Sequence, residues 1–143
     1  MKIYFACSIT GGREFESLYQ VMVNALVQAG HEVPTAHLAE PGAGADEAAL
    51  GPQAVYDRDV AWIRSSDVLI AEVSVPSHGV GYEIGYALGL GKRVLALHHK
   101  ERRVSKMITG NSDPLLQIHA FQAESEALQI MREFLMQGSG ASS

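Results

Sequence analysis

The sequence contains little cysteine, few basic residues and no long apolar run. Cys7 is the only cysteine among 143 residues, which excludes an intramolecular disulfide and fits a reducing compartment. Eleven basic residues against 16 acidic ones give a formal net charge of −5. That balance argues against a nucleic-acid polymer as partner, because phosphate backbones are bound through basic surfaces. We see neither a signal peptide nor a run of membrane length, so we expect no membrane association and a cytoplasmic location, with the nucleus left open.

Metal-binding patterns are also absent from the sequence. Its six histidines do not show the spacing, with cysteine or carboxylate partners, that is typical of a metal site. The glycine loop at residues 8–13 matches neither a dinucleotide-binding nor a triphosphate-binding motif. We therefore expect no metal and no cofactor.

The order of apolar runs and helical stripes predicts an α/β fold. Strands are predicted at 2–7, 31–35, 68–73, 93–98 and 118–121, and helices at 15–29, 53–65, from 80 onwards and at 123–136. Long connections are expected at 39–52 and 99–116. Alternating strands and helices give a doubly wound, five-stranded parallel sheet of the Rossmann or flavodoxin-like type, with helices on both faces. We expect one domain over residues 1–136 and a disordered tail at 137–143.

The segment 67–89 organises the rest of the chain. It predicts a buried strand, a turn containing Pro76, and a helix with Glu83 in about its first turn. Glu83 has two interpretations. It either complements the positive helix terminus, worth about 0.3–1 kcal/mol, or it is an ionised nucleophile kept charged by that dipole and by the loop amides.

The same helix has a glycine at every fourth position: Gly81, Gly85 and Gly89. This spacing indicates close packing against the helix backbone. The partner is either the sheet, which is the simpler interpretation, or a second subunit.

Three further positions are ambiguous from the residues alone. Asp59 lies in the apolar stripe of its helix, whereas Arg58 lies on the polar side. A carboxylate in that stripe is costly unless it is paired or used, so a structural role, as a buried cap or in a hydrogen bond to a tyrosine, and a functional role weigh equally. The loop 8–13 is either a phosphate-binding loop or an ordinary turn. His37 either contacts a ligand at the end of a strand or is a plain loop histidine.

Taken together, the segments Tyr4–Gly12 and Ser77–Glu83, with Asp59, resemble the nucleoside 2-deoxyribosyltransferase superfamily, and within it the 2'-deoxynucleoside 5'-monophosphate N-hydrolases. The resemblance covers nearly the whole chain. It implies that Glu83 attacks the anomeric carbon and forms a covalent glycosyl-enzyme. It also implies that Asp59 binds the sugar hydroxyl and orients the nucleophile or the leaving base, and that Tyr4 steadies Glu83.

The resemblance further implies a set of substrate-binding residues. Those that match the family's phosphate-binding positions are Ser8, Ile9, Thr10, Gly11, Gly12 and Ser77, together with Ser105, with Met107 beside it, from a neighbouring subunit. Gly79 is a further substrate-binding residue. Tyr19 and His37 match other positions near the ligand. A homodimer with shared sites is therefore expected.

The function that we expect is hydrolysis of deoxynucleoside monophosphates to a free base and 2-deoxyribose 5-phosphate. Base exchange by a transferase, hydrolysis of ribonucleotides such as CMP, and nucleotide binding without turnover are the alternatives. Thr10 stands where animal members carry a basic residue, which leaves the requirement for the phosphate open. The Gly/Ser-rich C-terminus argues against a transferase, because those enzymes resemble chains with carboxylates there.

Overall fold

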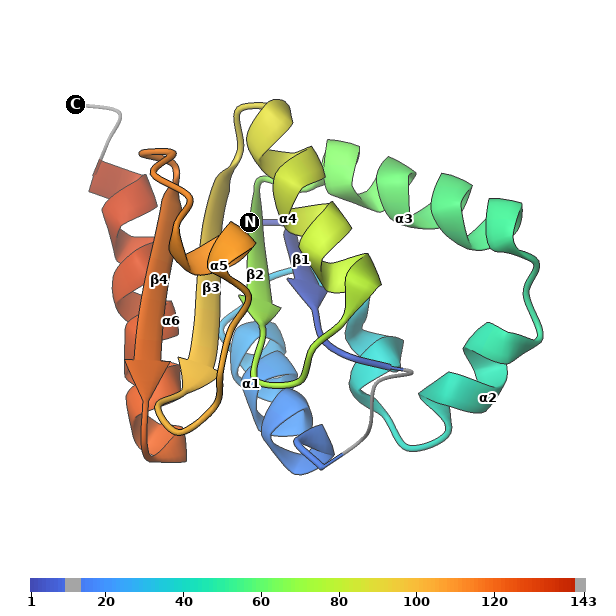
Figure 1. The fold of residues 1–143 in the computed structure, drawn as a ribbon, viewed down its shortest axis with the longest axis horizontal. Helices are drawn as coiled ribbons and strands as arrows, with labels where there is room; N and C mark the ends of the chain where they lie inside the picture. The colour runs from blue at the N-terminus through green and yellow to red at the C-terminus, as the bar shows by residue number, and fades with distance from the viewer. Residues whose placement is uncertain (10–13, 141–143) are drawn as a thin grey trace.

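A computed structural model describes residues 1–9 and 14–140 of the chain. In this range four parallel strands form one sheet in the order β1-β2-β3-β4 (Figure 1). Their bounds are Ile3–Ala6 for β1, Val68–Glu72 for β2, Arg93–His99 for β3 and Leu116–Phe121 for β4. β1 and β2 are buried along their whole length, as expected of parallel strands covered on both faces.

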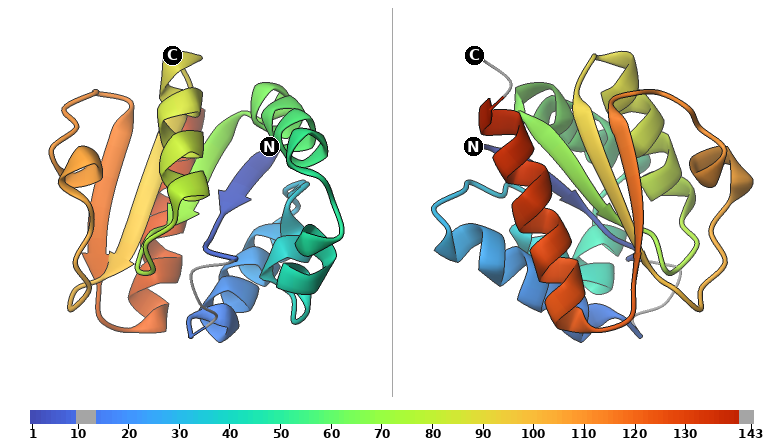
Figure 2. Two further views of the ribbon diagram at one scale, coloured as in Figure 1. Left: turned by 45° about the vertical axis from the view of Figure 1, so that its right-hand side comes forward. Right: turned by 90° about the vertical axis from the view of Figure 1, so that its left-hand side faces the viewer.

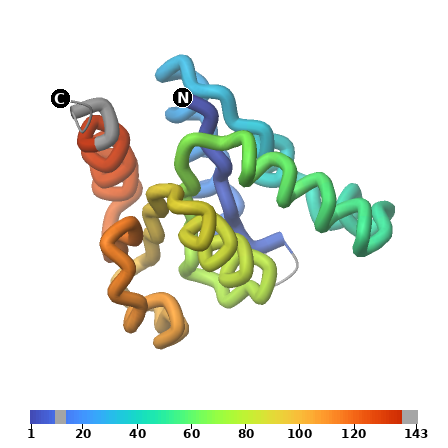
Figure 3. The backbone as a smooth tube through the Cα atoms, turned by 90° about the horizontal axis from the view of Figure 1, so that it is seen from above, coloured from blue at the N-terminus to red at the C-terminus, as the bar shows by residue number. Residues whose placement is uncertain are grey.

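Helices cover both faces of the sheet, which confirms the predicted α/β architecture. One face packs against α1 (Glu16–Gln28) and α6 (Glu124–Gly140), and α6 crosses it in the right-hand view of Figure 2. The other face packs against α4 (His78–Gly89) and the end of α3 (Pro52–Ser65). Seen from above, α3 runs beside α4 and extends away from the sheet (Figure 3). Two apolar cores result, one on each side.

The predicted strand at 31–35 is wrong, so the described sheet has four strands rather than five. Only Glu32 pairs with the sheet, through a single parallel bridge to Lys2. Pro34 lacks a backbone N–H, so it cannot continue the ladder. The hydroxyl of Thr35 then takes the place of a strand, accepting from the backbone N–H of Phe5 at 3.0 Å and donating to its carbonyl at 2.7 Å.

The two connections that we expected to be irregular contain short helices. Residues 39–52 include the end of η1 (Ala36–Ala39) and α2 (Ala43–Ala48), and the segment 99–116 includes α5 (Lys106–Thr109). α6 reaches Gly140, beyond the predicted end at Met136. Residues 141–143 of the predicted tail lie outside the described residues. In the described ranges, no helix combines the length and the apolar character needed to cross a bilayer.

Candidate active site

A cavity of about 470 Å³ opens beside the carboxyl ends of β1 and β2. Ligands of open parallel sheets collect at this edge. Tyr4 from β1, Asp59 from α3 and Glu83 from α4 all line it. The cavity therefore brings together, from elements far apart in the chain, the three residues for which the family resemblance predicts catalytic roles.

Glu83 is a half-buried carboxyl at the centre of this group. It lies in the second turn of α4, which begins at His78, so the expected first-turn position is wrong and the helix terminus is farther away. The hydroxyl of Tyr4 donates a hydrogen bond to its Oε2. Burial raises the pKa of Glu83 to about 7, and the nearby charge of Asp59 adds to the rise, whereas the Tyr4 bond and Arg58 lower it. The environment thus opposes ionisation of Glu83 at neutral pH instead of favouring it.

Tyr4 remains a proton donor in this setting. Its side chain is buried under α4, and burial followed by the charge of Glu83 raises the pKa of its hydroxyl well above the ordinary value. A protonated phenol can donate to the carboxylate of Glu83 throughout the physiological range. Tyr4 thus donates to Glu83, the residue that the family resemblance implies it steadies.

Asp59 is held by an arginine instead. Arg58 Nε donates to Asp59 Oδ1 at 2.9 Å, and Arg58 Nη2 lies 2.8 Å from Oε1 of Glu47. The Arg58 guanidinium also lies over the ring of Trp62, 4.9 Å from its centroid. Burial raises the pKa of Asp59 above its ordinary value, although Arg58 acts in the opposite direction. Arg58 was expected on the polar side of its helix, but here it links α2 to α3 through Glu47 and Asp59, which line the cavity.

His37 lies near this network but not on the cavity wall. It belongs to η1 rather than to a strand end, and its exposed ring packs edge-on against Trp62, with centroids 5.6 Å apart. Its charge, when present, lowers the pKa of Asp59. The structure thus places His37 against Trp62 rather than on the cavity wall.

The phosphate-binding candidates divide between described and undescribed residues. Ile9 lines the cavity, and Ser8 is fully buried beside it at the end of β1. Thr10, Gly11 and Gly12 lie outside the described residues.

At the other side of the cavity, the start of α4 presents Ser77 and Gly79. Ser77 is the N-cap of α4, and its hydroxyl accepts from the backbone N–H of Val80 at 3.3 Å. The first turn of a helix carries unpaired N–H groups and a partial positive charge, and such sites bind phosphate.

Besides Ser8 and His37, three further predicted substrate-binding residues do not line this cavity. Tyr19 is fully buried in the core on the other face of the sheet and packs edge-on against Phe5, with ring centroids 6.5 Å apart. Ser105 caps α5, and Met107 is 85% exposed beside it. These two residues line a second hollow of about 430 Å³, which shares Ser77 with the first.

The sequence interpretation missed two site residues, Glu47 and Arg58. Glu47 lines the cavity from α2, a segment assigned to a loop because it lies among glycines and Pro41. The Ala-rich run at 43–48 was the available signal, since alanine favours helices. Within residues 1–9 and 14–140, His, Cys, Asp and Glu side chains do not gather in groups of three that could hold a metal.

A model of the nucleoside 2-deoxyribosyltransferase family matches residues 3–132. The chain belongs to this family. It is 42% identical over 149 residues to 5-hydroxymethyl-dUMP N-hydrolase of Mus musculus, covering 99% of this chain and 86% of the mouse protein. It is also 42% identical over 142 residues to 5-hydroxymethyl-dUMP N-hydrolase of Danio rerio, with 94% and 95% covered.

Among solved structures, this chain resembles the CMP N-glycosidase of Clostridium botulinum. The TM-score is 0.69, the identity is 22%, and the match covers 92% of this chain and 99% of the other. At that identity the similarity concerns the fold alone, and it agrees with the α/β architecture described above.

Proposed function

We propose that this protein hydrolyses the N-glycosidic bond of 2'-deoxynucleoside 5'-monophosphates. One observation carries the proposal: Glu83 and Asp59 share a cavity whose rim is the amino-terminal end of α4. Two carboxyl groups beside an anomeric carbon suit glycosidic cleavage, because its transition state has the character of an oxocarbenium ion. The names of the mouse and zebrafish relatives support the same reaction.

In the first step, an oxygen of ionised Glu83 attacks C1' of the sugar. The C1'–N bond breaks, its electron pair leaves with the base, and a glycosyl ester of Glu83 remains. Tyr4 holds the other carboxylate oxygen and so orients the attack. Burial makes Glu83 a reactive anion once it is ionised, since few solvent interactions need to be lost.

In the second step, water attacks C1' and the ester bond returns its electron pair to Glu83. We assign the accompanying proton transfers to Asp59: its raised pKa suits it to give a proton to the leaving base and to take one from the attacking water. The products are the free base and 2-deoxyribose 5-phosphate. Arg58 keeps Asp59 oriented during both steps.

The phosphate group is assigned to the first loop and to the start of α4. We assign its binding to Ser8, Ile9, Thr10, Gly11 and Gly12 of the first loop and to Ser77 and Gly79 at the start of α4. The observed basis is that Ile9, Ser77 and Gly79 line one cavity and that the α4 terminus attracts anions. Apolar side chains of Leu50, Val55 and Val60 on the remaining wall leave room for the base.

We further propose a homodimer in which Ser105 and Met107 reach the partner's site. The glycine stripe of α4 supports this arrangement, because a Cβ built on Gly81, Gly85 or Gly89 meets no atom within 4 Å. The sheet is therefore not what packs against these glycines. Tyr82 on the same helix is 56% exposed. A second copy would cover this face, and the single cysteine supports a cytoplasmic setting for the assembly.

Base release measured by chromatography tests the reaction. The panel contains deoxynucleoside monophosphates, among them 5-hydroxymethyl-dUMP, with matched ribonucleotides and with deoxynucleosides plus an acceptor base. We expect release from deoxynucleotides, no release by Glu83→Gln, and full activity in Glu133→Gln, a matched control on the exposed side of α6. Base exchange without net hydrolysis would identify a transferase instead.

Mixing two inactive variants tests the shared site. A Glu83→Gln dimer mixed with a Ser105→Ala dimer should regain activity, because a mixed dimer contains one site with both residues intact. Gly85→Leu should give monomers that are folded but weakly active, since the single chain has space for the side chain. Monomers with full activity would refute the shared site.

A further inference from the structure

A second buried glutamate lies at the end of β2, on the opposite face of the sheet from Glu83. Glu72 is fully buried, and its place on the strand puts it on the same side as Ile70, toward α1 and α6. Ser74 satisfies both of its oxygens: the backbone N–H donates to Oε1 at 2.7 Å and the hydroxyl donates to Oε2 at 2.9 Å. Neither residue lines the cavity, so the mechanism above leaves the pair without a role.

The pair decides where β2 leaves the sheet. The parallel ladder continues one residue past β2, with Val73 N–H donating to the Leu97 carbonyl at 2.8 Å. At the next step the N–H of His99 donates to the Ser74 hydroxyl, also at 2.8 Å. Because the backbone N–H of Ser74 is bonded to Glu72, the chain turns away from the ladder here. Side chains thus end the ladder at a defined residue.

This turn leads directly into the proposed phosphate site. Ser77, three residues after Ser74, is the N-cap of α4 and lines the cavity. Val73, Ser74 and Val75 are buried, whereas the residues that follow are more exposed. The direction in which the chain leaves the sheet therefore sets the position of Ser77 and of the first turn of α4.

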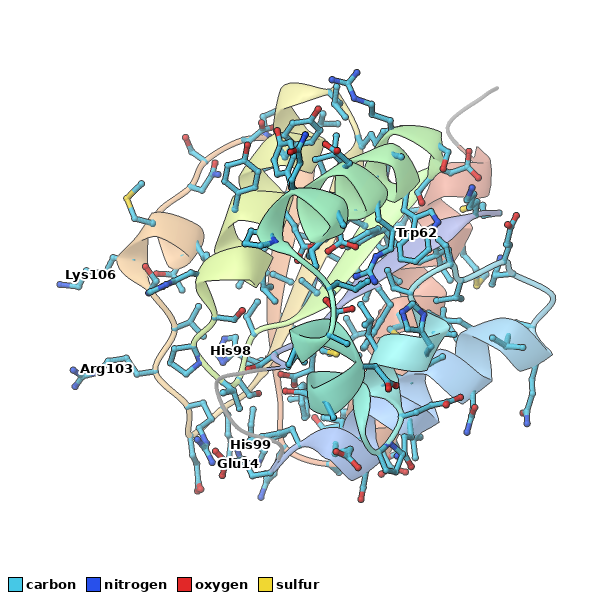
Figure 4. All side chains as sticks on the ribbon, turned by 90° about the vertical axis from the view of Figure 1, so that its right-hand side faces the viewer. Glu14, Trp62, His98, His99, Arg103 and Lys106 are labelled. Atoms are coloured by element: carbon cyan, nitrogen blue, oxygen red, sulfur yellow. The ribbon has the colours of Figure 1, made fainter. Side chains whose placement is uncertain are left out.

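The same cluster is connected to the beginning of α1. The Arg102 backbone N–H donates to the His99 carbonyl at 3.0 Å, and its guanidinium binds Glu14 at 3.0 Å. The charge of Arg102 also acts on Glu72, lowering a pKa that burial raises to about 7. Figure 4 shows His99 and Glu14 at the same end of the molecule, while Arg103 and Lys106 point outward. Of the basic residues in this segment, Arg102 is the one whose charge lowers the pKa of Glu72.

We propose that Glu72 and Ser74 are positioning residues, which fix the chain from Val73 to Ser77 and thereby hold the start of α4 against the substrate's phosphate. A buried carboxyl costs free energy, and apolar side chains often replace such groups without loss of stability. Stability of the fold is therefore a poor reason for this pair. Placement of a binding loop is a better one.

The inference rests on the proposed function, and its test separates effects on phosphate binding from effects on catalysis. In Glu72→Gln the amide offers one acceptor oxygen to two Ser74 donors, and in Ser74→Ala the hydroxyl is lost. We expect either change to raise KM for a deoxynucleoside monophosphate about tenfold, with kcat changed about twofold at most. For the corresponding deoxynucleoside, which lacks the phosphate, kcat/KM should stay within about twofold of the parent protein.

Ser74→Thr supplies a rescue, because it keeps the hydroxyl, and its KM should be close to that of the parent. Ile70→Val is the matched control: it removes one methylene from the same strand and face, and it should leave KM unchanged despite a small loss of stability. Equal losses with both substrates, or a KM shift in Ile70→Val as large as in Glu72→Gln, would show that the pair acts only on stability.

A binding measurement keeps the inference distinct from the proposed reaction. Calorimetric titration with 2-deoxyribose 5-phosphate reports the phosphate site without turnover. If the parent hydrolyses nucleotides and Glu72→Gln binds this probe as tightly as the parent, the positioning role alone fails. If the parent neither turns over the nucleotide panel nor binds the probe, the proposed function fails, and the positioning role fails with it.

Discussion

Two glutamates, the fully buried Glu72 and the half-buried Glu83, lie on opposite faces of one sheet and have similarly raised pKa values in different surroundings. Burial raises the pKa of each to about 7. Glu72 is enclosed, and Ser74 occupies both of its oxygens. Glu83 opens onto a cavity, and within the described residues Tyr4 is the only group that donates to it.

The difference teaches that a raised pKa does not by itself identify a nucleophile. Reaction needs an oxygen that is not already committed and enough space for a carbon atom to approach it. Glu83 has both, whereas Glu72 has neither. The comparison can be tested by changing each of these conditions in turn.

Removal of the nucleophile should have the largest effect. Glu83→Ala or Glu83→Gln should lower kcat by at least about 10³-fold, because the route through a covalent ester is lost. Single-turnover assays with mass spectrometry of the quenched protein provide the measurement. The parent should show a glycosyl adduct on the peptide containing residue 83, and detection of that adduct in Glu83→Gln would place the nucleophile elsewhere.

Asp59→Asn should lower kcat by about 10²-fold, because the amide cannot transfer protons to the base or from water. Steady-state kinetics with a good and a poor leaving base give the measurement. The loss should be smaller for the base that leaves more easily as an anion, since it depends less on a proton. A loss independent of the base would leave Asp59 with an orienting role only.

Stability should depend on pH through Glu83. Its folded pKa of about 7 exceeds the ordinary 4.5, so the folded state binds more protons between these values and the free energy of unfolding falls as pH rises across that interval. Glu83→Gln should therefore be more stable than the parent at pH 8 by about 1–3 kcal/mol. Denaturant unfolding at two pH values checks this. Glu72→Gln should gain less, because Ser74 loses one of its two acceptors.

The smallest effect concerns the ascending limb of the pH–rate profile. Because Glu83 must be ionised to attack, kcat/KM should rise with pH through about 7. The Tyr4 hydrogen bond lowers the pKa of Glu83, so Tyr4→Phe should move this limb to higher pH. A limb that stays in place, or moves to lower pH, would mean that the titrating group is not Glu83.

The sequence allowed the architecture to be predicted because each strand of the sheet is a compact apolar run, and each helix except the short η1, α2 and α5 has a clear stripe or turn signal. The prediction of a strand at 31–35 was wrong because the apolar pattern does not reveal that a side chain can replace backbone pairing. Here the Thr35 hydroxyl bonds the backbone N–H and carbonyl of Phe5. α2 was missed because flanking glycines and Pro41 outweighed its alanines. In both places local sequence preferences conflict, and tertiary contacts decide which structure forms.

Residue type and family resemblance agreed on Glu83, Asp59 and Tyr4, and the structure places these three residues around one cavity. Contacts across long sequence separations were predictable only through that resemblance, as for Tyr4 and Glu83, which lie 79 positions apart. Arg58 appeared solvated because a helical stripe gives no information about Glu47 on another element. No role was predicted for Glu72 because it is a single carboxylate within an otherwise apolar strand. The predicted roles of Ser105 and Met107 depend on a second subunit and remain predictions.

The hydroxyl of Thr35 has a consequence for solubility. An exposed strand edge presents unpaired N–H and C=O groups, and these can recruit another chain into a growing sheet. On the outer side of β1, the N–H of Ile3 donates to the Glu32 carbonyl, and both backbone groups of Phe5 are bonded to Thr35. A single threonine and one bridge thus seal this border of the sheet against edge-to-edge aggregation, with less chain than a full fifth strand would need.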